Sequence, residues 1–312
     1  VQPVRAQFGL PAPLSLTASP ASPSPGHEFI TTASTPTFDR DTAYFAWTVD
    51  GKPQPENSGV GKHQMTLRAS QTIGTPTRIS IAVSRKGAET ADASLVVTPS
   101  DLSLPWVADT SAPKWYRGKT MPTAGAMIAV VAVPQIVLNG SALDPESLIY
   151  RWSIDNTRNA LVGAGKRVFR FRASDFTKTS HQIDVVVEDI DRRIRKEGRV
   201  VIETGAPRVL LYAASPLGGI DFRTANFQAS GRRGLFDIRA EPFFFPATLA
   251  GALAYTWTLD NGSIEPFQGD QALLTFDANR RNAGNIPIAV SVRSTSPFLP
   301  SSSALFTLSL LP

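Results

Sequence analysis

Few residues in this chain of 312 have the types and spacing that catalysis needs. The three histidines, His27, His63 and His181, are far apart, and each falls in an expected turn or at the start of an expected strand. Cysteine is absent, which excludes thiol catalysis, cysteine-ligated zinc and disulfide bonds. The sequence has neither a Gly-x-Ser-x-Gly nor a His-Glu-x-x-His motif. We therefore predict that the chain is not an enzyme and uses no cofactor.

Two segments are similar to the end of a phosphate-binding loop but lack its first glycine. They are residues 117–120 and 163–166, where Pro113 and Ala160 take the place of that glycine. Residues 59–62 have the same Gly-x-Gly-Lys pattern as residues 163–166. The pattern therefore indicates a structural turn rather than a nucleotide site.

Carboxylates recur at one position and could bind a hard cation such as calcium. Asp50, Asp155 and Asp260 each follow a tryptophan by three residues, where aspartate also suits a tight hairpin turn. The threefold recurrence favours the hairpin. Residues 144–146 and 188–191 are the better calcium candidates, and we assign no metal ligand.

Basic residues outnumber acidic ones, 31 to 26, and form two clusters at residues 166–172 and 192–196. On a strand, the cations of the first cluster share the face that meets solvent. Acidic residues flank the second cluster, which we expect at the tip of a hairpin. This pattern favours acidic envelope polymers or phospholipid headgroups over nucleic acid as a charged partner.

The elements that must position these residues follow from a threefold repeat. Tryptophan recurs at intervals of 105 residues, at Trp47, Trp152 and Trp257, and each is followed by a glycine turn and further alternating apolar strands. Short strands with period-two alternation and frequent turns are typical of β-sandwiches. We predict an all-β chain of three tandem immunoglobulin-like β-sandwich domains, with these three tryptophans in the cores.

Composition shifts give the expected boundaries: an extended leader at residues 1–13, then domains at 14–99, 100–205 and 206–312. The linkers between these three repeats are short, so neighbouring repeats should be held close together. No run of 18 apolar residues occurs, so we expect no membrane-spanning segment here. The first residue is Val1, which suggests a processed product or a cut chain.

The second and third repeats each contain an aromatic loop that the first repeat lacks. The residues concerned are Trp106, Trp115 and Tyr116 in the second repeat, and Tyr212, Leu217 and Phe222 in the third. Their apolar character favours burial over solvent exposure. We expect each loop to pack back onto the preceding repeat and to fix the domain angles into a rod. The alternative is an exposed ligand platform.

The strand order and the Trp-x-x-Asp hairpin resemble bacterial immunoglobulin-like and PKD-like modules of cell-surface proteins. The chain is also similar to uncharacterised three-module secreted proteins of reduced-genome bacteria. The segments that carry the resemblance are residues 23–26, 45–51 with 59–62, 115–119 and 212–218. It implies a spacer, an adhesin or an assembly part located outside the cytoplasm.

Two functions remain open. The first is a non-enzymatic, extracytoplasmic structural or protein-interaction role at the cell surface, through protein partners or self-assembly. The second is a carbohydrate-binding or accessory region of a cell-envelope enzyme, which would bind envelope glycans. That role requires exposed, coplanar aromatic rings, for which Trp115, Tyr116 and residues 243–245 are the candidates.

Overall fold

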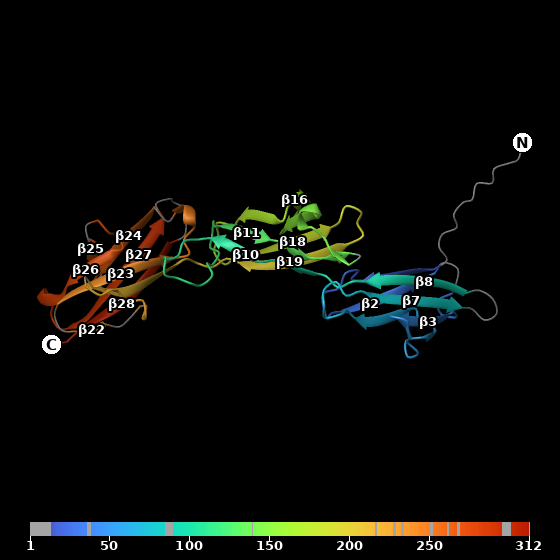
Figure 1. The fold of residues 1–312 in the computed structure, drawn as a ribbon. Helices are drawn as coiled ribbons and strands as arrows, with labels where there is room; N and C mark the ends of the chain where they lie inside the picture. Colours follow the sequence, from blue (N-terminus) through green and yellow to red (C-terminus); the bar gives the residue numbers. More distant parts are fainter. Residues whose placement is uncertain are drawn as a thin grey trace, which may run out of the picture. The chain divides into compact units, whose positions relative to one another are not determined.

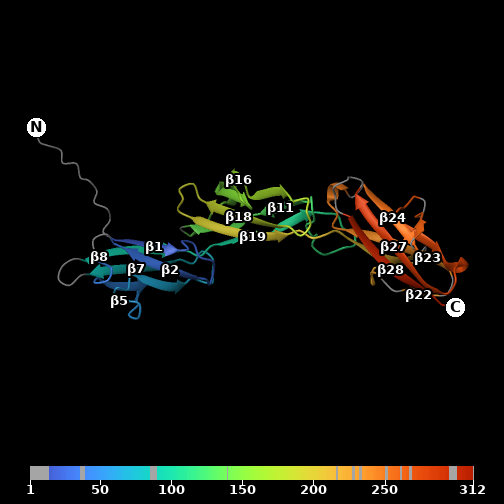
Figure 2. The same ribbon diagram turned by 180° about the vertical axis from the view of Figure 1, so that it is seen from behind.

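A computed structural model describes most of the chain, and the expected leader at residues 1–13 lies outside the described residues. The described residues are 14–35, 39–84, 90–138, 140–215, 217–226, 229–231, 234–249, 252–260, 262–266, 269–294 and 301–311. Within them the chain forms strands, turns and short 3-10 helices, with no α-helix (Figures 1 and 2). None of these helices has the length and apolar character of a membrane span.

The chain divides into two compact units, each described by itself. The first unit takes the described residues of 1–104, 132–167 and 184–199. The second takes those of 105–131, 168–183 and 200–312. The second repeat therefore contributes residues to both units.

The first repeat, in the first unit, has two antiparallel sheets that share one core. One sheet has the order β1-β2-β6, with β1 (Ser15–Ser19), β2 (Glu28–Ser34) and β6 (Gln64–Arg68). The other has the order β4-β3-β7-β8, with β5 also on β3: β3 (Tyr44–Val49), β4 (Lys52–Pro53), β5 (Gly59–Val60), β7 (Thr77–Ser84) and β8 (Thr90–Val97). Phe29 and Met65 from the first sheet pack with Trp47 and Ile81 from the second. This arrangement is a β-sandwich.

The second repeat has the same strand orders as the first. Its sheets are β10-β11-β17 and β16-β15-β18-β19, and it also contains the two-stranded pairs β12-β9 and β13-β14. Their bounds are β9 (Asp101–Ser103), β10 (Trp106–Asp109), β11 (Met127–Val131), β12 (Val133–Gln135), β13 (Val137–Leu138), β14 (Ser141–Ala142), η1 (Pro145–Ser147), β15 (Ile149–Ile154), β16 (Thr157–Ala164), β17 (Val168–Arg172), β18 (Ser180–Glu188) and β19 (Arg195–Glu203).

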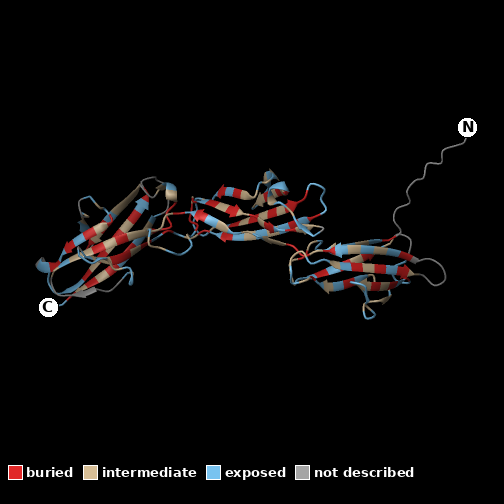
Figure 3. Ribbon diagram, in the orientation of Figure 1, coloured by how far each residue is buried: buried red, intermediate tan, exposed pale blue. Residues whose placement is uncertain are grey.

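The third repeat, in the second unit, has sheets β21-β20-β23-β26 and β22-β28-β27-β24-β25. Their bounds are β20 (Arg208–Ser215), β21 (Gly219–Ile220), β22 (Ala229–Gly231), β23 (Leu235–Phe243), η2 (Ala247–Leu249), β24 (Leu253–Leu259), β25 (Gly262–Ile264), β26 (Leu273–Asp277), η3 (Ala278–Arg280), β27 (Gly284–Ser294) and β28 (Ser301–Leu310). Buried and less buried residues alternate along β27 and β28, as the burial colours of Figure 3 show. Leu211 and Leu274 from one sheet pack with Trp257 and Val290 from the other. The predicted all-β fold with tandem immunoglobulin-like sandwiches is confirmed.

The three repeated tryptophans lie in the interior and are hydrogen-bonded in the same way. Their exposed fractions are 1% for Trp47, 0% for Trp152 and 1% for Trp257. Each indole Nε1 donates to a main-chain carbonyl: that of Lys62 at 2.8 Å, Lys166 at 2.7 Å and Gln271 at 2.9 Å, respectively. The buried indole N–H groups are thereby satisfied.

The Gly-x-Gly-Lys segments are the turns that present two of these carbonyls. Gly61 and Gly165, which directly precede the accepting lysines, have φ angles of 77° and 66°. This left-handed region favours glycine, because a Cβ atom would clash with the backbone there. The segments thus have a structural role that fully accounts for their pattern.

The repeated aspartates occupy tight turns. Asp50, Asp155 and Asp260 have φ angles of 46°, 48° and 53°. Aspartate tolerates this conformation better than most residues do. In the first repeat, Asp50 Oδ1 also accepts a hydrogen bond from the Arg78 N–H at 2.7 Å. The geometry favours the hairpin interpretation over calcium binding.

Replacing a repeated tryptophan tests how far its sandwich depends on it. We expect Trp257→Ala to lower the free energy of unfolding by about 3–5 kcal/mol, because it leaves a cavity and an unpaired Gln271 carbonyl. Urea denaturation followed by circular dichroism measures the loss. Leu305→Ala is the control, since Leu305 is 65% exposed on β28 and should change stability by less than about 0.5 kcal/mol. Equal effects of the two substitutions would contradict the proposed role of Trp257.

Candidate functional site: two junctions between successive repeats

The histidines do not form a catalytic group but bond locally. The Nδ1 atoms of His27 and His63 lie 3.1 and 3.0 Å from the carbonyl oxygens of Pro25 and Gly61. The Nε2 atom of His181 accepts a hydrogen bond from the Ser174 N–H at 3.2 Å. His27 and His63 therefore bond within their own turns, whereas His181 on β18 holds the segment that contains Ser174.

The calcium candidates are already used by arginines and backbone groups. Arg195 and Arg151 contact the buried Glu188 carboxylate at 2.6 and 3.3 Å. Burial alone would raise the pKa of Glu188, but the hydrogen bonds from the two arginines outweigh it and hold the pKa below its ordinary value. Asp189 accepts from Arg193 at 2.8 Å and from the Ile194 N–H at 2.9 Å.

The other candidate segment is also occupied. Asp144 caps η1 by accepting from the Glu146 N–H at 3.0 Å, and Glu146 pairs with Arg167 at 3.1 Å. Within the described residues no group of three or more possible ligands could hold a metal ion.

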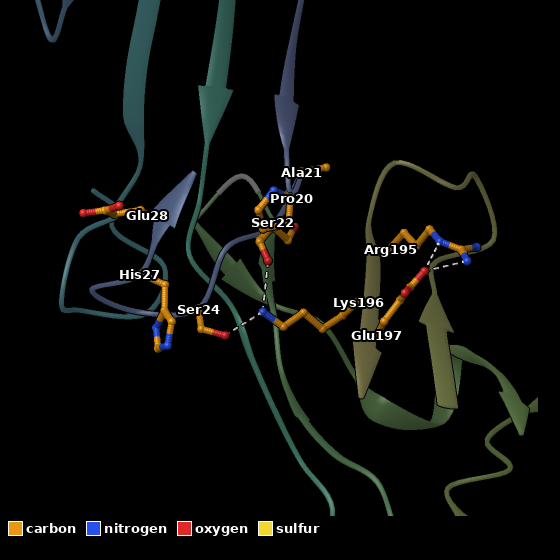
Figure 4. Close-up of a pocket in the computed structure, with 9 residues that line it drawn as sticks. All are labelled: Pro20, Ala21, Ser22, Ser24, His27, Glu28, Arg195, Lys196 and Glu197. Carbon is orange, nitrogen blue, oxygen red and sulfur yellow. Dashed lines mark hydrogen bonds and ion pairs between the residues drawn. The ribbon is translucent and has the colours of Figure 1, made fainter. Parts of the chain in front are cut away.

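The second basic cluster lies at a hairpin between β18 and β19, but one of its members turns inward. Arg192 has a φ of 55°, which marks the turn. Lys196, at the start of β19, is only 8% exposed. Its Nζ donates to the carbonyl oxygen of Ser22 at 2.9 Å and to Ser24 Oγ at 3.1 Å (Figure 4). It also donates to the carbonyl oxygen of Ser100 at 2.9 Å. Lys196 therefore links the second repeat to the first, within the first compact unit.

Burial lowers the pKa of Lys196, while the nearby Asp101 charge opposes that effect. A cavity of about 490 Å³ adjoins the lysine and is also lined by His27, Arg195 and Glu197. In Figure 4, Arg195 and Glu197 pair with each other on the side of the second repeat, and His27 and Glu28 belong to the first repeat. The lining is therefore mixed in charge.

Backbone and small residues complete this first junction. The Ser100 N–H donates to the Pro23 carbonyl at 3.0 Å. A Cβ atom at Gly74 would lie 2.9 Å from a methyl group of Val137, and Gly74 has a φ of 81°. The first repeat thus approaches β13 where only glycine leaves room. Sequence reasoning missed this junction because main-chain carbonyls and serines give no apolar signal.

The second junction is a cluster of aromatic rings within the second compact unit. The Trp115 ring lies 5.6 Å from Tyr212, 4.2 Å from Phe222 and 5.8 Å from Phe243, measured between ring centroids. Tyr116 lies 5.5 Å from Phe243 in an edge-to-face contact. Among the described residues the buried Trp115 Nε1 finds no hydrogen-bond partner, so the ring contacts are what position this side chain there.

Backbone hydrogen bonds reinforce the aromatic contacts. The Phe244 N–H donates to the Ser111 carbonyl at 2.6 Å, and the Ser111 N–H donates to the Phe245 carbonyl at 2.7 Å. Thr123, which is fully buried, donates its Oγ1 hydrogen to the Phe244 carbonyl at 2.7 Å. Phe244 has a φ of 64°, a conformation that costs a bulky residue about 1–3 kcal/mol and persists where the surroundings enforce it.

The predicted direction of packing missed one contact of the loop with Trp115 and Tyr116. Both residues pack on rings of the following repeat, the third, within the second compact unit. The prediction that Leu217 would be buried is wrong. Leu217 is 103% exposed, because it occupies the tip of the hairpin between β20 and β21, where its side chain points to solvent.

The other aromatic candidates are placed as follows. Tyr212 and Phe222 of the third repeat contact Trp115 of the second. Trp106 lies outside the cluster, and the Lys119 ammonium sits 3.2 Å from the centre of its ring. The candidate sugar platform is not flat and exposed. Residues 243–245 are at most 7% exposed, and most ring pairs in the cluster are nearly perpendicular.

Removing the buried ammonium tests the first junction. We expect Lys196→Met to lower the free energy of unfolding by about 1–3 kcal/mol, because the buried Ser100 carbonyl loses its charged donor. Urea denaturation at neutral pH measures the change. Lys52→Met is the matched control, since Lys52 is exposed on β4. A loss no larger than that of the control would contradict the junction.

The same lysine predicts a pH dependence. Because its folded-state pKa lies below the unfolded value of 10.5, the unfolded chain binds more protons between these two values. Stability contributed by this group is therefore fully present above pH 10.5 and is lost as the pH falls through the lowered pKa. We expect the stability difference between the wild type and Lys196→Met to grow as the pH rises through that window. If the stability difference between the wild type and Lys196→Met does not change with pH, the lowered pKa of Lys196 is contradicted.

The chain matches no protein-family model and no curated protein sequence. Several solved structures match the chain at low similarity. The three N-terminal domains of the bacteriophage RB49 Highly Immunogenic Outer Capsid protein (Hoc) match at 10% identity and a TM-score of 0.27, over 95% of this chain and 98% of that one. The Clostridium thermocellum CbhA fibronectin(III)-like modules match at 11% identity and a TM-score of 0.28, over 61% and 94%. A bacterial ice-binding adhesin matches at 9% identity and a TM-score of 0.25, over 97% and 99%. These values are too low to carry an argument about function.

Proposed function

We propose that the chain is a non-enzymatic structural or protein-interaction protein that works outside the cytoplasm, at the cell surface. Its immunoglobulin-like repeats, with the boundaries 14–99, 100–205 and 206–312, are joined by specific side-chain and backbone contacts. The PKD-like and secreted bacterial modules that the sequence resembles are the expected setting for such a protein. Protein partners or copies of the chain itself are the expected binding partners.

The second junction is the observation that carries this proposal. The aromatic residues that the sequence offers for binding are used to join two repeats. Trp115 packs on Tyr212, Phe222 and Phe243, and Phe244 is held in a strained backbone conformation by Ser111 and Thr123. These aromatic contacts and the strained backbone fix the third repeat against residues of the second, as expected of a protein that presents surfaces at defined positions.

The chemistry-bearing side chains support the non-enzymatic part of the proposal. The buried carboxylates of Glu188 and Asp189 are paired with arginines, and His27 and His63 bond within their own turns. Catalysis requires a group that is held close to a substrate and is free to act on it. The alternative role as an exposed aromatic platform for sugars is disfavoured, because its candidate rings at residues 243–245 are buried.

A double-mutant cycle tests the second junction. Trp115→Ala, Phe222→Ala and the double mutant should give a coupling energy of about 0.5–1.5 kcal/mol, the value typical of aromatic pairs. Urea denaturation followed by circular dichroism measures the stability of each variant. Trp106→Ala combined with Phe222→Ala is the control cycle, since the Trp106 ring lies against Lys119 instead. If the losses of stability from Trp115→Ala and Phe222→Ala are additive, the two rings do not interact and the proposed junction is contradicted.

The proposed location is tested on cells of the natural source. An antibody against the purified chain should label intact cells, and protease added outside should remove the signal. Labelling that requires permeabilised cells would contradict the extracytoplasmic proposal.

A further inference from the structure

A groove of about 370 Å³ lies beside the second junction, within the second compact unit. It is lined by Tyr116, Met121, Gly205, Ala206, Arg208 and Phe244. Tyr116 and Phe244 are members of the junction, so the groove stands on a rigid base. Met121 is 46% exposed, and it offers an apolar wall to a ligand.

The surroundings of the groove are positively charged. Arg208 lines it, and Lys114, Arg117 and Lys119 belong to the loop that supplies Tyr116 and Met121. All four cations are exposed, and none pairs with a carboxylate in the described part of the chain. By contrast, Arg193 on the turn before β19 is paired with Asp189, and Arg195 at the first position of β19 is paired with Glu188. The groove therefore attracts anions.

The chemistry of the lining indicates which ligands the groove suits. A guanidinium such as that of Arg208 binds a carboxylate or a phosphate through two parallel hydrogen bonds. The Tyr116 ring and the Met121 side chain suit the apolar face of a sugar ring. The Gly205 N–H already donates to the Pro122 carbonyl at 2.8 Å, so this amide is not free to pair with a peptide strand.

We propose that this groove binds a carboxylated oligosaccharide, that is, a glycan containing uronic acids. Arg208 binds the carboxylate, Tyr116 and Met121 contact a sugar ring, and the three loop cations attract the polyanion. The proposal goes beyond the structural role, because it adds a glycan to the protein partners proposed above. Its site also differs from the aromatic platform considered from the sequence, since Arg208 and Met121 are its principal contacts.

Calorimetry with a defined oligogalacturonate as the probe tests the proposal, at physiological salt. We expect saturable binding that Arg208→Gln weakens about tenfold or more, as expected for the loss of a charge-assisted contact. Arg158→Gln is the matched control, since Arg158 is an exposed arginine on β16 of the second repeat. That variant should bind like the wild type. Arg208 is also exposed, so Arg208→Gln should keep the wild-type unfolding curve.

Three comparison probes separate sugar recognition from other sources of affinity. A neutral dextran oligomer should bind at least tenfold more weakly than the oligogalacturonate, and so should an oligoglutamate peptide and an inorganic polyphosphate of similar charge. Equal binding of any of the three overturns the proposal, as does absence of binding or an equal effect of Arg158→Gln. The Trp115–Phe222 coupling reports separately on the junction, so the failure of one proposal is distinguishable from the failure of the other.

Discussion

Each repeated tryptophan brings an indole N–H group into a largely apolar interior, where it must find an acceptor. In all three repeats the acceptor is a main-chain carbonyl fourteen or fifteen residues further along the chain. The indole therefore does two things at once: it fills the centre of the core and ties one strand to a distant turn. A chain without cysteine has no disulfide for that purpose. The glycines before Lys62 and Lys166 follow from this requirement, because they let the chain turn so that the carbonyl faces inward.

Two kinds of feature could be predicted from the sequence: segments that recur in all three repeats, and strands in which apolar and polar residues alternate. The period-two alternation specifies which face of a strand is buried, so the strands around Trp47 and Trp257 and the all-β fold could be predicted. The turn at Asp50 could be predicted because an aspartate recurs at the same position, three residues after the tryptophan, in every repeat. The first junction could not be predicted in this way. Lys196 looked like one more cation on a solvated hairpin tip, and only the fold shows that it meets the carbonyls of Ser22 and Ser100.

The aromatic loops show the other limit of a sequence pattern. Composition indicated that Trp115 and Leu217 would avoid water, but it does not say which surface each side chain packs against. That surface is determined by where the preceding strand ends. Strand β10 delivers Trp115 to the end of the second repeat from which the third departs, whereas the hairpin between β20 and β21 leaves Leu217 in solvent. An apolar residue at a hairpin tip stays exposed unless another surface reaches it.

The left-handed Phe244 has a consequence for how this chain could change through evolution. Its conformation depends on a hydrogen bond donated to Ser111 and one accepted from Thr123, residues that lie more than a hundred positions earlier in a different repeat. Recombination that exchanged the third repeat alone would separate this corner from Ser111 and Thr123. The incoming repeat would have to bring its own match for them. The second and third repeats are therefore expected to be inherited as a pair, and duplication or exchange should involve both together, although each has its own tryptophan and its own set of strands.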